Sequence, residues 1–368
     1  MAKVIFYPLR NADCCLIRLD NDRLFVFDYA DRRDPLDAED KRIDLKQAFH
    51  EDIDFPNRKY VDVLAFTHGD DDHVHKASEV FWLEHAQIYQ RDDRVKANEL
   101  WVPAGMIVEE GLEDDAKILR AEARYRFLNR KGIRVFSRPT HLKEWLEERG
   151  RKLEDYAHLI TDAGQLVPNL DLVNDEVEFF IHSPFAERDG DKLLDRNENC
   201  LVTQAIIRSG GRDTKFLITA DSIWEGWEKM VNITRAHGND GRLGWDILKI
   251  PHHCSYLSMA ADKGSYKTEP TAEFEWLLNQ GTTRAIMVSS SREIPTETTD
   301  QPPHVETYRR YKETADSIDA DIVVTMENPS KRQPKRTIIE ISGNGPMLTK
   351  EAFGAGVAVT TTRSPRVG

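Results

Sequence analysis

Short runs of hydrophobic residues separated by polar turns open the chain and predict a β-sheet. Three such runs cover residues 3–9, 14–21 and 22–30, with a turn at Asn21-Asp22 between the second and the third. Runs of this length that are rich in β-branched and aromatic residues are typical of strands. A further strand is expected at 61–66 (VDVLAF), and its apolar character stops at Thr67, where a polar cluster begins.

The pattern changes to a helical one between about residues 76 and 165. Apolar residues recur there at helical spacing in two stripes, Leu112, Ala116, Leu119, Ala123 and Phe127, then Leu142, Trp145, Leu146 and Leu153. Such stripes indicate core packing of amphipathic helices. We therefore interpret residues 86–165 as a helical insertion and expect it to form a lid or a docking surface at the rim of the site.

Strand-like patterns then return and alternate with helical ones. Further strands are expected at residues 176–184, 200–210, 214–221, 246–253, 283–290, 321–326 and 336–341, and a helix at 305–316. No internal repeat is visible. Strands, inserted helices, and then strands with helices predict an α/β fold, a layered sheet sandwich covered by helices.

Composition and charge limit the function. No apolar run approaches the roughly 18–20 residues of a membrane span, and no secretory signal opens the chain, so we expect a soluble, cytoplasmic protein without a membrane partner. The four cysteines form no CxxC pair, which disfavours a cysteine zinc site. The net charge of −13 would repel a polyanion, so nucleic-acid binding requires a local, metal-assisted or partner-assisted site. Residues 343–368 are expected to be a flexible basic tail.

A cluster of histidines and aspartates follows the strand at 61–66. In the sequence THGDDDH, His68, Asp70, Asp72 and His73 supply imidazole and carboxylate groups on one short loop. Such a loop can aim two pairs of ligands at two divalent ions about 3.5–4 Å apart. Mixed nitrogen and oxygen donors suit zinc, manganese or iron better than magnesium alone. The alternative is a solvated acidic turn.

Two later strands end in metal-type ligands in the same way. One strand ends at Asp221, and another ends at His252 and His253. Loops at strand ends commonly carry the chemistry of α/β enzymes, because the sheet fixes their positions. Three strand ends therefore point to one metal-dependent site.

These motifs resemble the metallo-β-lactamase superfamily, closest to the hydrolase domain of bacterial ComEC-type DNA-uptake channels. The resemblance covers residues 1 to about 85 and 175–342, and it implies an αββα sandwich over residues 1–342. It also implies two metal ions: His68 and Asp70 would hold the first, Asp72 and His73 the second, and Asp221 would bridge them. His252 is the preferred last ligand, with His253 as a ligand or substrate contact.

The same resemblance implies supporting and catalytic roles. Asp28, at the end of LFVFD, would orient the ligand loop from outside the metal ligands, and Asn199 in NENCLV would contact substrate. His304 in PPH is either a turn histidine or a proton donor, catalytic together with Asp72 and Asp221. The superfamily's third histidine of the first metal has no clear counterpart here. His182, in an apolar strand, is expected to be a structural histidine.

The expected function is metal-dependent hydrolysis by water activated between two divalent ions, zinc or manganese. The resemblance favours phosphodiester bonds, hence a nuclease or nucleotide phosphodiesterase. The charge favours a nucleotide or a short or single-stranded nucleic acid as substrate. Two alternatives remain: a lactone, ester or β-lactam hydrolase, or a non-catalytic metal-binding subunit that docks a protein partner through residues 86–165.

Overall fold

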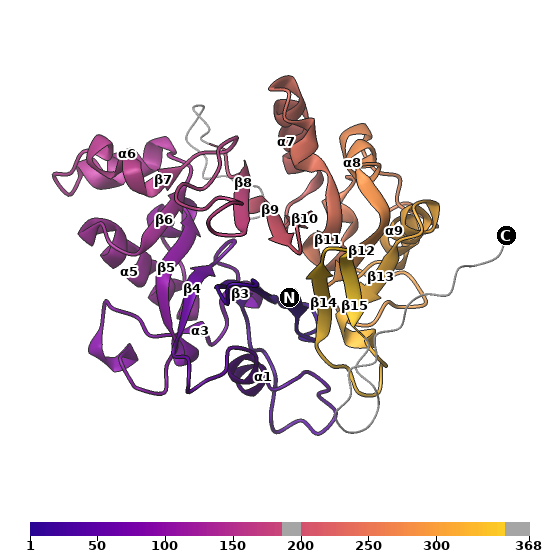
Figure 1. The fold of residues 1–368 in the computed structure, drawn as a ribbon, viewed down its shortest axis with the longest axis horizontal. Coiled ribbons are helices and arrows are strands. Elements are labelled where there is room, and N and C mark those ends of the chain that lie inside the picture. The colour runs from indigo at the N-terminus through magenta and orange to yellow at the C-terminus, as the bar shows by residue number, and fades with distance from the viewer. Residues whose placement is uncertain (186–199, 350–368) are drawn as a thin grey trace.

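Two β-sheets packed face to face form the centre of the molecule, seen in a computed structural model that describes residues 1–185 and 200–349 (Figure 1). The first sheet has nine strands in the order β15-β14-β1-β2-β3-β4-β5-β6-β7, and the second has six in the order β13-β12-β11-β10-β9-β8. The first and the last strands of the described chain thus belong to one sheet.

The strand bounds agree closely with the apolar runs of the sequence. The first sheet contains β1 (Ala2–Phe6), β2 (Cys14–Arg18), β3 (Leu24–Tyr29), β4 (Tyr60–Ala65), β5 (Lys96–Pro103), β6 (Ile133–Phe136), β7 (Ile160–Thr161), β14 (Thr337–Ser342) and β15 (Gly345–Thr349). The second contains β8 (Val177–Ser183), β9 (Val202–Ser209), β10 (Arg212–Ile218), β11 (Trp245–Lys249), β12 (Gly281–Ser289) and β13 (Asp321–Val324). Every strand predicted from the sequence is confirmed.

Helices connect and cover the strands. The α-helices are α1 (Leu45–Asp52), α2 (Asp71–Val74), α3 (Ala77–Val80), α4 (Gly105–Val108), α5 (Asp114–Asn129), α6 (Thr140–Glu147), α7 (Trp224–Ala236), α8 (Ala272–Leu278) and α9 (Val305–Ser317). Short 3-10 turns are η1 (Gln87–Tyr89), η2 (Leu153–Leu159), η3 (Asp240–Leu243), η4 (His252–Cys254), η5 (Tyr256–Ser258) and η6 (Thr325–Glu327).

Strand direction places several loops at one edge of the sandwich. In the first sheet β3, β4, β5, β6 and β7 run parallel, for example with Val26 beside Leu64. In the second sheet β10, β11, β12 and β13 run parallel in the same manner. Parallel strands place their carboxyl ends on one side of a sheet, where α/β proteins bind ligands.

Three hydrophobic clusters define four layers. In β3, Phe25 and Phe27 point into a cluster shared by the two sheets, whereas Leu24 and Val26 point outward into a cluster with α1, α5 and α6. A third cluster packs α7, α8 and α9 on the outer face of the second sheet. Helices outside and two sheets inside make an αββα sandwich, which confirms the predicted fold class.

The range expected to be a helical insertion is only partly helical. Residues 86–165 contain α4, α5 and α6, but also β5, β6 and β7, which extend the first sheet. The helical insertion expected at 86–165 thus also contributes three strands to the first sheet. The strand at 96–103 escaped notice because its first half is polar and half-exposed, and only its second half is buried.

Helix α5 lies against the motif loop instead of forming a separate lobe. A Cβ atom on Gly69 would lie 3.5 Å from Cδ2 of Leu112, just before this helix. The Asp115 carboxylate accepts hydrogen bonds from the backbone N–H groups of Lys76 (2.8 Å) and Ser78 (3.0 Å). The first apolar stripe is buried in the outer cluster, so α5 supports the loop from the helical layer, where we expected a lid.

The C-terminal expectation needs a correction at its start. Residues 345–349 form β15, which pairs with β14 through Ile339 and Leu348 among other contacts, so a flexible tail does not begin at residue 343. Residues 350–368 lie outside the described part of the chain. Among the residues described, no helix has the length and apolar character required to cross a membrane.

Candidate metal centre

The predicted ligands come from loops at the carboxyl ends of β4, β10 and β11. The polar motif begins at Thr67, directly after β4, Asp221 follows β10, and His252 and His253 follow β11. Several of these positions have left-handed backbone, with φ of 50° at Ala220 and 52° at His253. Non-glycine residues rarely adopt this conformation, and they concentrate at functional sites.

Four of the side chains converge on one point. Nε2 of His73 lies 3.3 Å from Oδ1 of Asp221. Nε2 of His253 lies 3.4 Å from Oδ2 of Asp221 and 3.3 Å from Oδ2 of Asp72. Asp221 thus faces both imidazoles, one with each oxygen, as a carboxylate shared between two sites would.

His68 and Asp70 lie beside this group. Nε2 of His68 is 3.6 Å from Oδ2 of Asp70, and the centres of the His68 and His73 rings are 3.9 Å apart. His68 is buried, while the Asp70 side chain is 32% exposed. The structure therefore brings His68, Asp70, Asp72, His73 and Asp221 together, with the first pair on the more open side.

Hydrogen bonds outside the cluster orient the imidazoles. The Asp28 carboxylate accepts from Nδ1 of His73 (2.8 Å) and from the backbone and hydroxyl of Thr67 (2.7 and 2.8 Å). Nδ1 of His253 donates to the carbonyl of Ser290 (2.6 Å). Each contact occupies Nδ1 and leaves Nε2 free to act as a metal ligand, the arrangement usual for ligating histidines.

Two buried charged residues of the centre were missed. Asp13, in the β1–β2 loop, has a carboxylate oxygen 2.7 Å from Nζ of Lys249 and 3.7 Å from Nε2 of His73. Ligand atoms of Asp13, His73, Asp221 and His253 all lie within 4.8 Å of one another. A signal was present: Lys249 sits in the apolar run DILKI, and a buried lysine requires a carboxylate partner.

The donor atoms fit a metal cation. Among the described residues, Nε2 of His68, Nε2 of His73, Nε2 of His253 and Oδ1 of Asp221 are buried without a hydrogen-bond partner. Buried polar atoms are seldom left unpaired, so four converging ones indicate a missing partner. All four are metal-ligand types suited to zinc or a similar ion.

The pKa values of the central histidines and of Asp221 also indicate a site for positive charge. Burial opposes charge on His253, but the Asp221 carboxylate raises its pKa to about 10. Burial likewise opposes charge on His73, and Asp221 and Asp28 still raise its pKa well above the usual value. In the opposite direction, burial is outweighed by His253 and His73, which lower the pKa of Asp221. Positive charge is therefore stabilised where a cation would bind.

The two histidines after β11 bear on the choice of the last predicted ligand. His252 was preferred on the resemblance, but the structure places His253, not His252, against Asp72 and Asp221. His252 is half-buried and its ring centre lies 6.5 Å from that of His253. The turn of left-handed residues after β11 rotates the two neighbouring side chains apart, which a motif cannot reveal.

Three further residues were considered from the sequence: His304, His182 and Asn199. His304 is buried; its ring Nδ1 accepts from the backbone N–H of Tyr256 (3.2 Å), and its backbone N–H donates to the carbonyl of Cys254 (3.1 Å). His182 contacts the Arg242 carbonyl (2.9 Å) on the α7 side of the second sheet, the structural role expected for it. Asn199 lies outside the described residues.

Comparisons with known proteins give a likeness in solved structures alone. No protein-family profile matches the chain, and no curated protein does. A candidate metal-dependent hydrolase from Parabacteroides distasonis is 9% identical, with 88% of this chain and 93% of that one covered and a TM-score of 0.37. A diphosphatase from the PhnP family is 10% identical, with 89% and 83% covered and a TM-score of 0.30. A class B3 di-zinc metallo-β-lactamase from an Alaskan soil metagenome is 11% identical, with 83% and 85% covered and a TM-score of 0.33.

Likenesses this weak assign neither a family nor an activity. The class of protein is set by the chain's own structure: an αββα sandwich with a buried cluster of carboxylates and imidazoles at the ends of its parallel strands.

Proposed function

We propose that the protein is a metal-dependent hydrolase of phosphodiester bonds, a nuclease or a nucleotide phosphodiesterase. The observation that carries the proposal is Asp221, whose two oxygens face His73 and His253 separately. A carboxylate in that position can be shared by two cations, and paired divalent ions are the usual catalysts of phosphodiester hydrolysis.

The residues divide between two ions, zinc or manganese. His68, Asp70 and Asp221 would hold the first, and Asp72, His73, Asp221 and His253 the second. When bound, such ions lower the pKa of water toward about 7 and stabilise negative charge on a substrate oxygen. Asp28 and Ser290 hold the imidazoles of His73 and His253 in the tautomer that presents Nε2.

His304 supports proton transfer to the leaving group. Its Nδ1 accepts from the backbone N–H of Tyr256, so the proton of the neutral ring is on Nε2, on the side of the backbone of Asp300. Burial lowers the pKa of His304, which keeps the ring neutral near pH 7. We assign Nε2–H as the group that donates to the departing oxygen.

The charge of the chain bears on the size of the substrate. Two divalent cations add up to +4 at the centre, and charges farther away than roughly 8–10 Å are screened at physiological salt. A phosphodiester can therefore bind in spite of the net charge of −13. Long duplex DNA would also meet the acidic surface, so a nucleotide or a short or single-stranded nucleic acid is the proposed substrate. A protein partner at residues 86–165 stays a prediction.

The test is a substrate panel on protein reconstituted with zinc or manganese. Bis-nitrophenyl phosphate, a cyclic nucleotide and a single-stranded oligonucleotide should be cleaved, and an ester, a lactone and a β-lactam should not. Asp221→Asn should abolish turnover with an unchanged circular dichroism spectrum. Hydrolysis of the carbonyl substrates alone would replace the proposal by a carbonyl hydrolase. Metal binding without any turnover would indicate a non-catalytic subunit.

A further inference from the structure

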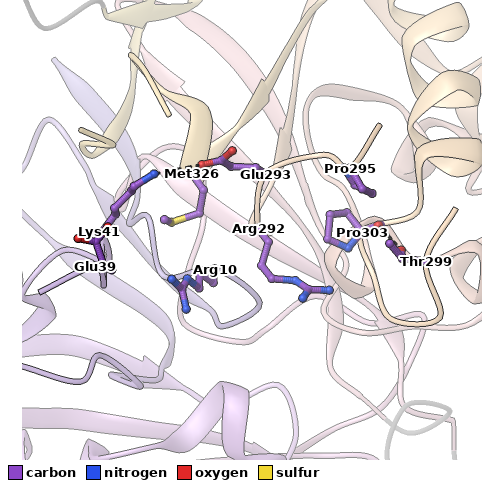
Figure 2. A pocket seen from close by; sticks show the side chains of 9 residues that line it. All are labelled: Arg10, Glu39, Lys41, Arg292, Glu293, Pro295, Thr299, Pro303 and Met326. Carbon is purple, nitrogen blue, oxygen red and sulfur yellow. Dashed lines mark hydrogen bonds and ion pairs between the residues drawn. The ribbon is translucent and has the colours of Figure 1, made fainter. Parts of the chain in front are cut away.

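A cavity of about 500 Å³ is lined in part by residues of loops that also carry residues of the metal centre (Figure 2). Arg10 of the cavity and Asp13 of the centre belong to the β1–β2 loop. Arg292 and Pro303 of the cavity belong to the β12–α9 segment, which also contains Ser290, the partner of His253. Such a volume falls within the roughly 300–1,000 Å³ of small-molecule sites.

Asn11 joins these two segments. Its side-chain oxygen accepts from the backbone N–H of Arg292 (3.0 Å), and its amide donates to the carbonyl of Pro302 (2.7 Å). His304 is two residues beyond Pro302 and is tied in turn to the carbonyl of Cys254 (3.1 Å). The wall of the cavity and the loops of the metal centre therefore form one continuous framework.

Two guanidinium groups face this cavity without carboxylate partners in the described structure. Arg10 makes no hydrogen bond or ion pair there, and its backbone has a φ of 62°. Arg292 donates through Nη2 to the carbonyls of Pro302 (2.6 Å) and Gln301 (3.4 Å), which leaves its other N–H groups available. Figure 2 shows both side chains in the space between Lys41 and Pro303.

The acidic residues of the lining do not cancel these charges. Glu293 lies 3.8 Å from Nζ of Lys41, another residue of the lining, which offsets its charge. Glu39 is exposed. A concentration of unpaired arginine in a chain of net charge −13 indicates an anion, and the planar guanidinium fork matches phosphate.

The other lining residues suit the rest of a nucleotide. Met326, Pro295 and Pro303 give the cavity an apolar portion next to the arginines. Thioether and proline surfaces pack against flat rings, whereas the guanidinium groups bind the phosphate. We propose that this cavity is a subsite for the nucleotide unit next to the scissile bond, with its phosphate bound by Arg10 and Arg292.

This subsite rests on the proposed phosphodiesterase function and makes it more specific. The experiment compares dithymidine monophosphates that carry a terminal phosphate at the 5′ end, at the 3′ end, or at neither end. Metal-loaded wild-type protein should prefer one phosphorylated form at least tenfold in kcat/KM. In Arg10→Asn that preference should fall about tenfold, chiefly through KM, and Arg10→Lys should restore part of it. Asparagine tolerates the left-handed backbone at this position.

Arg284→Asn is the matched control. Arg284 is an exposed residue of β12 that pairs with Asp319. The variant removes one positive charge and should leave the preference unchanged. Absence of a preference in the wild type would overturn the subsite. An equal loss on all three substrates in Arg10→Asn would also overturn it, because that result means a disturbed metal loop.

A binding measurement separates this proposal from the proposed function. Thymidine 5′-phosphate and thymidine 3′-phosphate are titrated into metal-free protein in the presence of a chelator. Saturable binding of either that is weakened about tenfold in Arg10→Asn, and not in Arg284→Asn, supports the subsite even if no phosphodiester is cleaved. Absence of saturable binding at millimolar concentration overturns the subsite even if phosphodiesters are cleaved.

Discussion

The carboxylate of Asp28 accepts a hydrogen bond of 2.8 Å from Nδ1 of His73, and Nε2 of the same ring faces Asp221. Asp28 itself is held by two hydrogen bonds from Thr67, at the end of β4. A histidine of the candidate metal centre is thus fixed in tautomer and orientation by a carboxylate from the neighbouring strand, β3.

Asp28→Asn should weaken metal binding without removing a ligand. An amide cannot accept from Nδ1–H as strongly and gives no charge compensation, so we expect metal affinity to fall about 10–100-fold. Competition with a fluorescent chelator measures the change. Asp93→Asn, at an exposed position paired with Arg91, is the control and should bind metal like the wild type. An unchanged affinity in Asp28→Asn would contradict the supporting role.

The two neighbouring histidines after β11 provide an internal comparison. His253→Gln should lower metal content and reduce turnover by at least about a hundredfold, because His253 faces both Asp72 and Asp221. His252→Gln should keep its metal. Elemental analysis of both variants after dialysis decides the assignment. Retention of metal by His253→Gln together with loss in His252→Gln would restore the assignment made from the motif.

The sequence was sufficient to predict eleven of the fifteen strands of the described chain and most of the residues of the cluster. Apolar runs ending at Thr67 and Asp221 located two ligand loops, because burial on both faces of a sheet requires continuous apolar segments. The choice between His252 and His253 could not be predicted, since it depends on backbone dihedral angles in a turn. The short strands β6 and β7 were missed for a similar reason: their four and two residues give too little pattern.

Asp13 shows a different limit of sequence reasoning. It follows β1 in a loop with no motif, and its importance appears only when the second sheet places Lys249 against it, 236 residues later in the numbering. Local patterns predict which segments are strands, but the pairing of buried charges across two sheets depends on the complete fold. The cavity beside Arg10 depends on such long-range packing too.

Lys249 and Asp13 form a buried ion pair that should matter most when metal is absent. Burial opposes charge on Lys249, but Asp13 raises its pKa, so the ammonium persists at neutral pH. Lys249→Met leaves a buried carboxylate uncompensated, a change that typically costs about 3–5 kcal/mol. We expect a lower Tm in metal-free protein and a larger rise of Tm on adding zinc or manganese than in the wild type.

The double variant Lys249→Met with Asp13→Asn should recover much of the lost stability. Additive losses in this double-mutant cycle would show that the pair does not interact.

Glu122 should make the fold sensitive to acid through helix α5. This buried carboxylate of α5 contacts Arg126 (2.6 Å) and His85 (2.9 Å). Burial alone would raise its pKa, but the hydrogen bond from His85 and the charge of Arg126 outweigh it and lower the pKa from 4.5 to about 2. Because the pKa of Glu122 is lowered, its ionised carboxylate stabilises the fold at pH values above the ordinary pKa of 4.5, and this contribution is lost as the pH falls from about 4.5 to 2.

Glu122→Gln should therefore be about 2–4 kcal/mol less stable than the wild type at pH 7, and the difference should shrink toward pH 2. Urea unfolding across this pH range measures it, with Glu147→Gln on the exposed face of α6 as the control. A difference that stays constant with pH would show that the charge of Glu122 does not stabilise the fold.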